Sequence, residues 1–199
     1  TVDYTALNNN TLYLGKSLES YSYSLITLDQ NYSLYRHHEM VAIDSNLYLF
    51  GDLHTDSDSY NKLYKIDLST NTMEQISIQD PDDATNEIKS RHFISMISLD
   101  NSIFICGGIN ANQYLSNFIS IDTTTNYFEI KSFDASELGK PSERTGHSLV
   151  VIPKPNTGLQ DYNPVLYIFG GRYNATYYND LYRFTGEGTS FKITLTSNV

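Results

Sequence analysis

The residues best suited to hold a metal ion lie in one acidic segment, residues 52–58. Asp56 and Asp58 match the first two ligand positions of an EF-hand calcium loop, in which carboxylate oxygens surround the ion. The match ends there, because Tyr60 stands at the next ligand position and Asn61 stands where that loop needs glycine. We therefore expect a solvated acidic loop and no metal site.

Residues that could act as nucleophiles or general bases do not form a catalytic motif. The sequence lacks a His-Glu-x-x-His metal motif, a phosphate-binding loop and a Gly-x-Ser-x-Gly nucleophile elbow. His37, His92 and His147 follow closely on an arginine, where we expect them to hydrogen-bond within the fold. The single cysteine, Cys106, lies inside an apolar run and is expected to be a small buried hydrophobe. We expect no catalytic residue and no cofactor.

The chain is acidic, with 23 Asp and Glu against 13 Lys and Arg and a net charge of −10 over 199 residues. A nucleic acid requires a basic footprint, and an anionic membrane surface attracts cations, so we expect neither as a partner. With Cys106 alone the chain cannot form an internal disulfide, which favours a reducing compartment and predicts a cytoplasmic location.

Short apolar runs that end at glycine recur along the chain. They occupy residues 12–15, 47–51, 103–108 and 166–171. A second apolar run follows each of them, over residues 25–29, 63–67, 118–122 and 181–185. Six residues after the end of each second run stands a large apolar side chain: Tyr35, Met73, Phe128 and Phe191. This constant offset predicts the same hairpin register in all four units, with turns over residues such as 69–71 and 186–188.

An arginine opens three of the units, ahead of a further apolar strand: Arg36, Arg91 and Arg144. Each unit therefore contains four strands, which we name a to d in chain order. Helix-forming residues do not gather at a 3.6-residue period, so the chain is expected to consist of strands and turns. Four-stranded repeats are the unit of a β-propeller, in which the sheets, called blades, pack around a common axis.

The pattern resembles the kelch repeat, whose hallmarks are Arg or His entering strand a, Gly-Gly ending strand b, and Trp about six residues past strand c. The third and fourth units match with Gly107-Gly108 and Gly170-Gly171, whereas the second has Gly51-Asp52 and the first has Gly15-Lys16. The tryptophan position holds Tyr, Met or Phe throughout. The resemblance implies one all-β, kelch-type β-propeller domain over residues 1–199, with repeats at about 2–35, 36–79, 91–133 and 144–196.

Four four-stranded blades are visible in this sequence, fewer than kelch propellers usually have. An incomplete ring leaves two open flanks, whose apolar faces and strand edges invite association. We therefore expect these blades to form part of a larger propeller of six or seven blades. Either further sequence or another chain would complete it, and self-association of the open flanks is the alternative.

The loops between strands b and c and the crossovers between units emerge on one face of a propeller. These segments are residues 16–23, 52–62, 79–90, 109–116, 133–143 and 172–179, and together they hold 11 acidic and 5 basic side chains. They also hold several Tyr and Asn residues, which suit protein recognition because they combine contact area with adaptable hydrogen bonds. The residues expected to contact a partner are Asp56, Asp58, Tyr60, Asp82, Asp83, Asn112, Tyr114, Arg172, Tyr177 and Tyr178.

The kelch resemblance implies a non-enzymatic protein-interaction module, a scaffold or adaptor such as those of signalling and cell polarity. The acidic loops predict that the partner protein carries a basic segment. The alternative is a kelch-fold enzyme or sugar-binding propeller, similar to galactose oxidase or to sialic acid mutarotase. Clustered His or Arg side chains in the central channel would favour that alternative, whereas a rim lined by Tyr and Asp would favour the scaffold.

Overall fold

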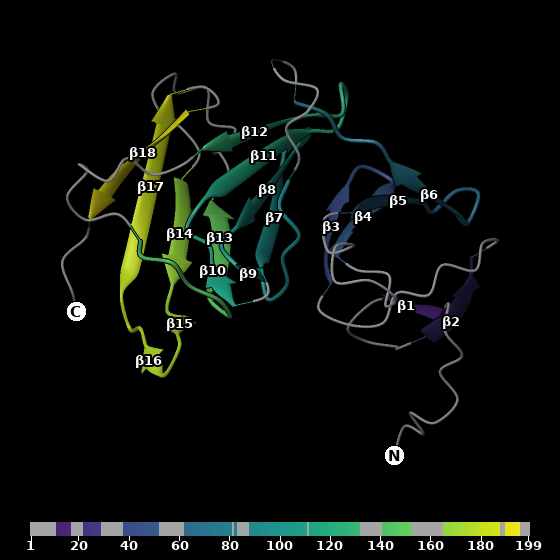
Figure 1. Ribbon diagram of the computed structural model, residues 1–199. Coiled ribbons are helices and arrows are strands. Elements are labelled where there is room, and N and C mark those ends of the chain that lie inside the picture. The colour runs from purple at the N-terminus through teal and green to yellow at the C-terminus, as the bar shows by residue number, and fades with distance from the viewer. Residues whose placement is uncertain are drawn as a thin grey trace.

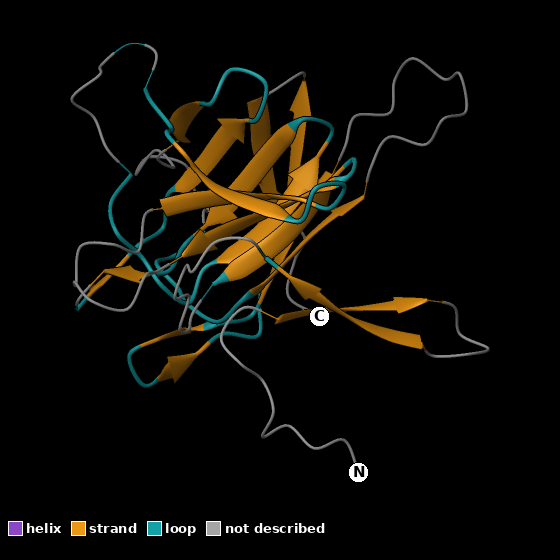
Figure 2. Ribbon diagram, turned by 90° about the vertical axis from the view of Figure 1, so that its right-hand side faces the viewer, coloured by secondary structure: helices purple, strands orange, loops and turns teal. Residues whose placement is uncertain are grey.

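The computed structural model consists of β-strands and loops (Figures 1 and 2). It describes residues 11–16, 22–28, 38–51, 62–80, 82, 88–110, 112–131, 141–152, 165–187 and 190–195. Over these ranges the chain contains no helix, and hence none that could span a membrane.

Three four-stranded antiparallel sheets follow one another along the chain. Blade 2 consists of β3 (Glu39–Ile43), β4 (Asn46–Gly51), β5 (Lys62–Asp67) and β6 (Thr72–Ile76). Blade 3 consists of β7 (Ser95–Leu99), β8 (Ser102–Cys106), β11 (Phe118–Asp122) and β12 (Tyr127–Lys131). Blade 4 consists of β13 (Ser148–Ile152), β14 (Val165–Phe169), β17 (Leu181–Glu187) and β18 (Ser190–Leu195). The pair β1 (Thr11–Lys16) and β2 (Ser22–Thr27) represents blade 1.

The first strand of each complete blade lies innermost. Strand β7 contacts β3 of the preceding blade and β13 of the following one, so the three sheets share an axis along their a strands. In each sheet the four strands pair in chain order from the axis outward. The predicted all-β architecture of four-stranded propeller blades is confirmed, and the described blades form an open arc (Figure 1).

Two short hairpins extend from the b–c connections of blades 3 and 4. One is formed by β9 (Ile109–Asn110) and β10 (Gln113–Tyr114), and the other by β15 (Arg172–Tyr173) and β16 (Thr176–Tyr177). We call these two hairpins the ribbons. Each begins directly after a Gly-Gly pair, and Figure 1 shows both at the lower end of their blades.

An aspartate closes the c–d hairpins of blades 2 and 3. Asp67 Oδ1 accepts hydrogen bonds from the Ser69 amide at 2.8 Å and from the Ser69 hydroxyl at 2.6 Å. Asp122 Oδ1 accepts the same two bonds from Thr124. The last turn residue of each hairpin adopts a positive φ, 58° at Asn71 and 60° in blade 3, a region that asparagine tolerates better than most residues. These turns give the register that the constant six-residue offset predicts.

The c–d hairpin of blade 4 departs from that register by two residues. Phe191 pairs with Gly186, and strand β17 continues through Glu187, so residues 186 and 187 belong to the strand rather than to the turn. The reason lies in two positions of the sequence. Thr185 replaces the turn-closing aspartate and Thr189 replaces the asparagine, so the four-residue turn of the other blades loses both supporting side chains. Tyr35, the fourth residue of this predicted series, lies outside the described residues.

The hydrophobic core lies between neighbouring sheets. Between blades 2 and 3 it includes Phe50 and Leu63 from one sheet and Ile105 and Ile119 from the other. Between blades 3 and 4 it includes Phe104, Phe118, Leu166, Ile168 and Phe184. Cys106 belongs to this second cluster and is 2% exposed, so the expectation of a small buried hydrophobe is confirmed. Burial raises the pKa of its thiol to about 12, which leaves it a poor nucleophile.

Candidate functional site

Two buried arginines fix the end of blades 3 and 4 from which the ribbons extend. Arg144 donates from Nη1 to the carbonyl oxygen of Gly170 at 2.9 Å and from Nε to the carbonyl oxygen of Ser142 at 3.1 Å. Arg91 repeats this pattern with the carbonyl oxygens of Gly107 at 3.3 Å and Lys89 at 3.1 Å. Each arginine therefore ties the segment before strand a to the glycine pair after strand b.

The two arginines differ in their side-chain partner, which is the residue directly before strand c. Arg144 binds both carboxylate oxygens of Asp180, at 2.6 and 2.9 Å, whereas Arg91 binds Asn117 Oδ1 at 2.7 Å. Burial alone would raise the pKa of Asp180, but the hydrogen bonds and charge of Arg144 hold it below its usual value. Burial beside the neutral Asn117 lowers the pKa of Arg91 to about 10.

Blade 2 does not offer its arginine the same partner. By strand register the equivalent position in blade 2 is Lys62, the first residue of β5, whose positive charge cannot pair with an arginine. Arg36 and His37, which the sequence places at the start of this blade, lie outside the described residues. The arginine framework is therefore observed in blades 3 and 4, where the Gly-Gly pairs are intact.

Backbone hydrogen bonds anchor both ribbons. Arg172 and Thr145 exchange amide-to-carbonyl bonds of 2.9 and 3.0 Å, and Ile109 and His92 exchange bonds of 2.9 and 3.0 Å. The amide of Tyr178 then returns to the carbonyl of Gly171 at 2.8 Å, as the amide of residue 115 does to Gly108 at 2.9 Å. The ribbons are thus held at their base by the segments that carry the framework arginines.

The ribbons of blades 3 and 4 meet through two tyrosines. The rings of Tyr114 and Tyr173 lie 4.8 Å apart between centroids, with an interplanar angle of 51°. Tyr177, which pairs with Arg172 at the base of its ribbon, is 78% exposed, and Tyr173 is 40% exposed. Below them Tyr178 stacks on the Arg144 guanidinium at 4.5 Å. Tyr114, Tyr173, Tyr177 and Tyr178 therefore gather at this end of blades 3 and 4, and we call these four tyrosines the tyrosine face.

The structure brings together half of the residues expected to contact a partner. Those on the two ribbons or directly beside them are Asn112, Tyr114, Arg172, Tyr177 and Tyr178. Asp82 lies apart from them, because Gln79 bridges to Tyr127 at the c–d turn end of blade 3, the end opposite the ribbons. Four further residues, Asp56, Asp58, Tyr60 and Asp83, lie outside the described residues.

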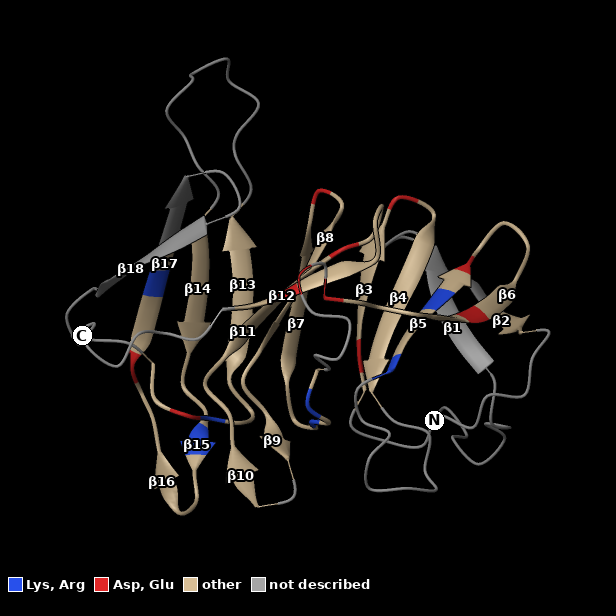
Figure 3. Cartoon of the chain, turned by 45° about the horizontal axis from the view of Figure 1, so that its top comes forward, with Lys and Arg blue, Asp and Glu red and all other residues tan. Residues whose placement is uncertain are grey.

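Among the residues that the structure describes, negative charge gathers away from the ribbons. Asp44, Asp67, Asp100 and Asp122 lie at the a–b and c–d turns, at the opposite end of the blades (Figure 3). Arg172 is exposed on the ribbon of blade 4, and the nearby Asp180 is engaged by Arg144. Apart from the exposed Glu143 beside Arg144, acidic character at the tyrosine face would have to come from the loops outside the described ranges.

Sequence reasoning did not single out Asn117 and Asp180, although they complete the arginine framework. A signal was available, because each stands directly before strand c of a unit with an intact Gly-Gly pair. Tyr173, which the sequence places in the same loop as Tyr177, also joins the site through its ring contact with Tyr114.

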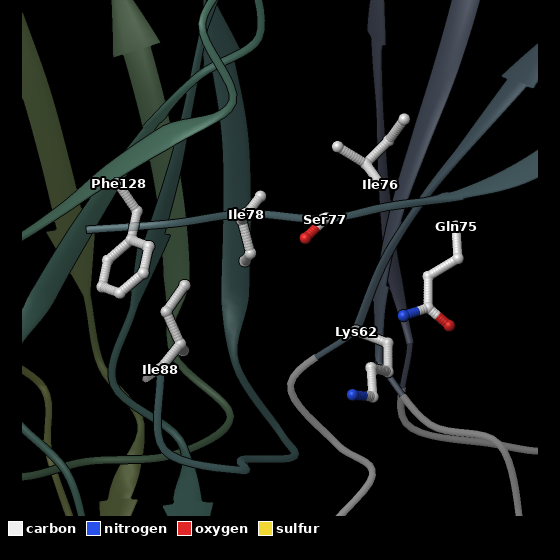
Figure 4. A pocket seen from close by; sticks show the side chains of 7 residues that line it. All are labelled: Lys62, Gln75, Ile76, Ser77, Ile78, Ile88 and Phe128. Carbon is white, nitrogen blue, oxygen red and sulfur yellow. The ribbon is translucent and has the colours of Figure 1, made fainter. Parts of the chain in front are cut away.

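A separate cavity of about 190 Å³ lies where the chain passes from blade 2 to blade 3 (Figure 4). Ile76, Ile78, Ile88 and Phe128 line part of it, and the polar residues Lys62, Gln75 and Ser77 line the rest, so that most of its exposed wall is polar. It holds no pair of titratable groups that could move a proton. Over the described ranges no three His, Cys, Asp or Glu side chains come together as a metal site. The tyrosine face is therefore the better candidate for function.

His147 does not fill the hydrogen-bonding role expected for it. Its ring is 6% exposed, and neither ring nitrogen has a hydrogen-bond partner among the described residues. A Cβ on Gly107 would lie 2.8 Å from His147 Cε1, and a Cβ on Gly171 would lie 2.9 Å from His147 Cβ, so this residue fills the space between the two glycine pairs. Burial, with the neighbouring charge of Arg144, lowers the pKa of His147 to about 4.

This shift makes stability depend on pH. The folded state favours the neutral ring, so the stabilisation is complete above the unfolded pKa of about 6.5 and is lost as pH falls towards 4. We expect the wild-type chain to lose about 2–3 kcal/mol from this group between pH 7 and pH 4.5. His147→Ile, which copies Ile94 of blade 3, should remove that part of the loss. Urea unfolding at both pH values measures it, and equal losses in both proteins would contradict the assignment.

A comparison with protein families agrees with these features. The family model described as the KLHDC2/KLHL20/DRC7 Kelch-repeats domain matches residues 4–197. The match includes every described blade, the two Gly-Gly pairs and both framework arginines. The chain therefore belongs to the kelch-repeat family.

Proposed function

We propose that this chain is a non-enzymatic scaffold or adaptor that binds another protein through its tyrosine face. Kelch-repeat domains are generally protein–protein interaction modules, and domains of this type are typically non-enzymatic. The observation that carries the proposal is the contact between Tyr114 and Tyr173, which joins the ribbons of two blades into one exposed aromatic surface.

The rigidity of the ribbons supports this assignment. Tyrosine presents a large contact area with only two side-chain torsions to immobilise, so it suits the centre of an interface. The ribbons are fixed at their base by paired backbone hydrogen bonds to His92 and Thr145. A partner therefore meets a surface that is ordered before binding, which lowers the entropic cost of association.

The proposal includes a partner with a basic segment. The acidic side chains of the b–c segment of blade 2, Asp56 and Asp58, would attract Lys and Arg over a distance of about 8 Å in physiological salt. The proposal also places the protein in the cytoplasm, on the strength of its single unpaired cysteine. Signalling and cell polarity are the settings in which we would first look for the partner.

Truncation of the tyrosine face should abolish partner binding. Tyr173→Ser and Tyr177→Ser remove exposed rings, so we expect each to weaken binding at least tenfold, as at an aromatic interface anchor, with an unchanged melting temperature. Tyr127→Ser is the matched control, because Tyr127 is 47% exposed at the opposite end of blade 3. Proteins captured from a lysate are quantified by mass spectrometry, and the affinity of each is then measured by calorimetry. A partner that both ribbon variants bind as tightly as the wild type would refute the proposal.

Charge reversal tests the basic segment separately. Asp56→Lys with Asp58→Lys, in the sequence between β4 and β5, should weaken binding of a basic partner and reduce its dependence on salt, without lowering the melting temperature. Asp100→Lys, in an exposed a–b turn at the opposite end of the blade, is the control. Equal affinity and equal salt dependence in all three proteins would remove the basic segment from the proposal and leave the tyrosine face in place.

A further inference from the structure

The ring contact between Tyr114 and Tyr173 brings two phenols from different blades together. Tyr114 lies in β10 of the blade 3 ribbon and Tyr173 lies in β15 of the blade 4 ribbon, and the two ribbons lie side by side (Figure 3). The ring centroids are 4.8 Å apart and the ring planes meet at 51°. This separation is at the short end of the range for paired aromatic rings, so carbon atoms of one ring contact carbon atoms of the other.

The backbone of both tyrosines is anchored. Tyr114 pairs with Ile109, whose amide and carbonyl are bonded to His92 at 2.9 and 3.0 Å. Tyr173 directly follows Arg172, which is bonded in the same way to the segment before β13. Each phenol therefore extends from a fixed strand position, and the two rings meet far more often than tyrosines that must diffuse together.

The pair is also open to small molecules in solution. Tyr173 is 40% exposed and Tyr114 is half-buried, so an oxidant dissolved in water reaches the contact. The neighbouring Tyr178 and Tyr182 are arranged differently. Each of their rings packs on the Arg144 guanidinium, at 4.5 and 5.0 Å, so that the group facing the ring is a cation rather than a second phenol. Accessible phenols in direct contact are the arrangement that oxidative coupling requires.

We propose that Tyr114 and Tyr173 form a site of intramolecular dityrosine formation. The oxidant is hydrogen peroxide activated by a haem peroxidase, which removes one electron and one proton from each phenol. The unpaired electron of each tyrosyl radical is shared between the phenol oxygen and the two Cε carbons beside it. A single bond forms between a Cε carbon of Tyr114 and a Cε carbon of Tyr173. Each of these carbons then loses its proton, and each phenol oxygen regains one. The protein has lost two hydrogen atoms, and one peroxide molecule has become two water molecules.

The new bond joins the ribbons of blades 3 and 4 covalently. It is a carbon–carbon bond, so thiol reductants do not break it, and it persists in the reducing compartment proposed above. It also restricts the unfolded chain between residues 114 and 173, and a crosslink of that kind stabilises the folded state. The proposal is independent of partner binding at the tyrosine face, because the coupling needs only the two rings and the oxidant.

Peroxidase treatment of the full chain tests the site. The dilute protein is exposed to hydrogen peroxide and a haem peroxidase, reduced with a thiol and digested. We expect mass spectrometry to find the peptides that contain residues 114 and 173 joined with the loss of two hydrogen atoms, together with dityrosine fluorescence. Tyr114→Phe and Tyr173→Phe keep the ring but lack the phenol, so each should lower the intramolecular yield at least about tenfold. Tyr177→Phe is the matched control, because Tyr177 is 78% exposed on the same ribbon, and it should leave that yield unchanged.

A second measurement tests the crosslink through stability. Treatment should raise the urea midpoint of the wild type and leave that of Tyr173→Phe where it was, since the variant gains no crosslink. Three results would overturn the proposal. One is dityrosine that forms without a joined peptide of residues 114 and 173. Another is an equal yield in the wild type and the Tyr173→Phe variant. The third is a crosslinked fraction that rises in proportion to protein concentration, which would show coupling between separate chains.

Discussion

Replacing Arg144 with leucine is expected to destabilise the chain by about 3–5 kcal/mol, the cost of removing one member of a buried charge pair. The Arg144 side chain is 1% exposed, and its loss leaves Asp180, 24% exposed, without a counter-charge. It also removes the hydrogen bond to the carbonyl of Gly170 and the stacking of the guanidinium between Tyr178 and Tyr182. Urea unfolding at pH 7 measures the change.

Asp180→Asn provides the matched comparison. It converts the Arg144 pair into the arrangement that blade 3 already uses, where Arg91 binds Asn117 at 2.7 Å. We expect a cost of about 1 kcal/mol, since a neutral acceptor replaces a charged one in the same place. If Arg144→Leu costs no more than Asp180→Asn, the arginine does not hold this end of the blade.

The same pair predicts a dependence on acid. The pKa of Asp180 lies below its ordinary value, so its stabilisation is present above the unfolded pKa of about 3.9 and is lost as pH falls below it. That window lies below the one that His147 controls. The two effects can therefore be separated by comparing Asp180→Asn with His147→Ile.

The parts of the fold that follow from local chemistry were open to prediction from the sequence. Apolar runs closed by glycine mark strand b, because a buried strand and a residue with positive φ each leave a local signature. The structure places β4, β8 and β14 on these runs, and Gly107 and Gly170 have φ of 63° and 67°. The kelch pattern supplied the order of the strands.

What the sequence could not supply depends on contacts between blades. The register of β17 with β18 depends on the residue types at two positions, Thr185 and Thr189. The six-residue offset used for the prediction takes no account of these residue types. The role of His147 depends on the neighbouring sheet, because its ring fills space between two glycine pairs rather than accepting a hydrogen bond. The contact of Tyr114 with Tyr173 likewise exists only once blades 3 and 4 are packed together.

The candidate site shows the same division. The residues on the ribbons could be predicted from sequence, because a Gly-Gly pair marks the end of strand b and therefore the start of the b–c loop. The position of Asp82 could not be predicted. After β6 the chain pairs with the start of β12 through Gln79, before it reaches the first strand of blade 3. The sequence predicts that the crossover from blade 2 to blade 3 lies on the ribbon face. In the structure the parallel bridge between Gln79 and Tyr127 places its first part at the opposite end of blade 3.

Gly107→Ala is expected to cost about 3–5 kcal/mol, well above Gly146→Ala at about 1–2 kcal/mol. The two glycines share the same backbone conformation, with φ of 63° and 64°, so alanine suffers equal strain at both. They differ in surroundings. A Cβ on Gly107 would lie 2.6 Å from the Arg144 carbonyl oxygen and 2.8 Å from His147 Cε1, whereas a Cβ on Gly146 would meet nothing within 4 Å.

The difference between these two variants isolates the close approach of blades 3 and 4. The Arg144 carbonyl cannot yield easily, because it accepts the hydrogen bond of the Gly108 amide at 3.0 Å and so ties the start of blade 4 to blade 3. Gly170→Ala should resemble Gly146→Ala, since the nearest atom to its Cβ would be the Tyr178 carbonyl oxygen at 3.4 Å. Equal losses for Gly107→Ala and Gly146→Ala in urea unfolding would mean that φ alone, and not the neighbouring blade, requires glycine at the end of strand b.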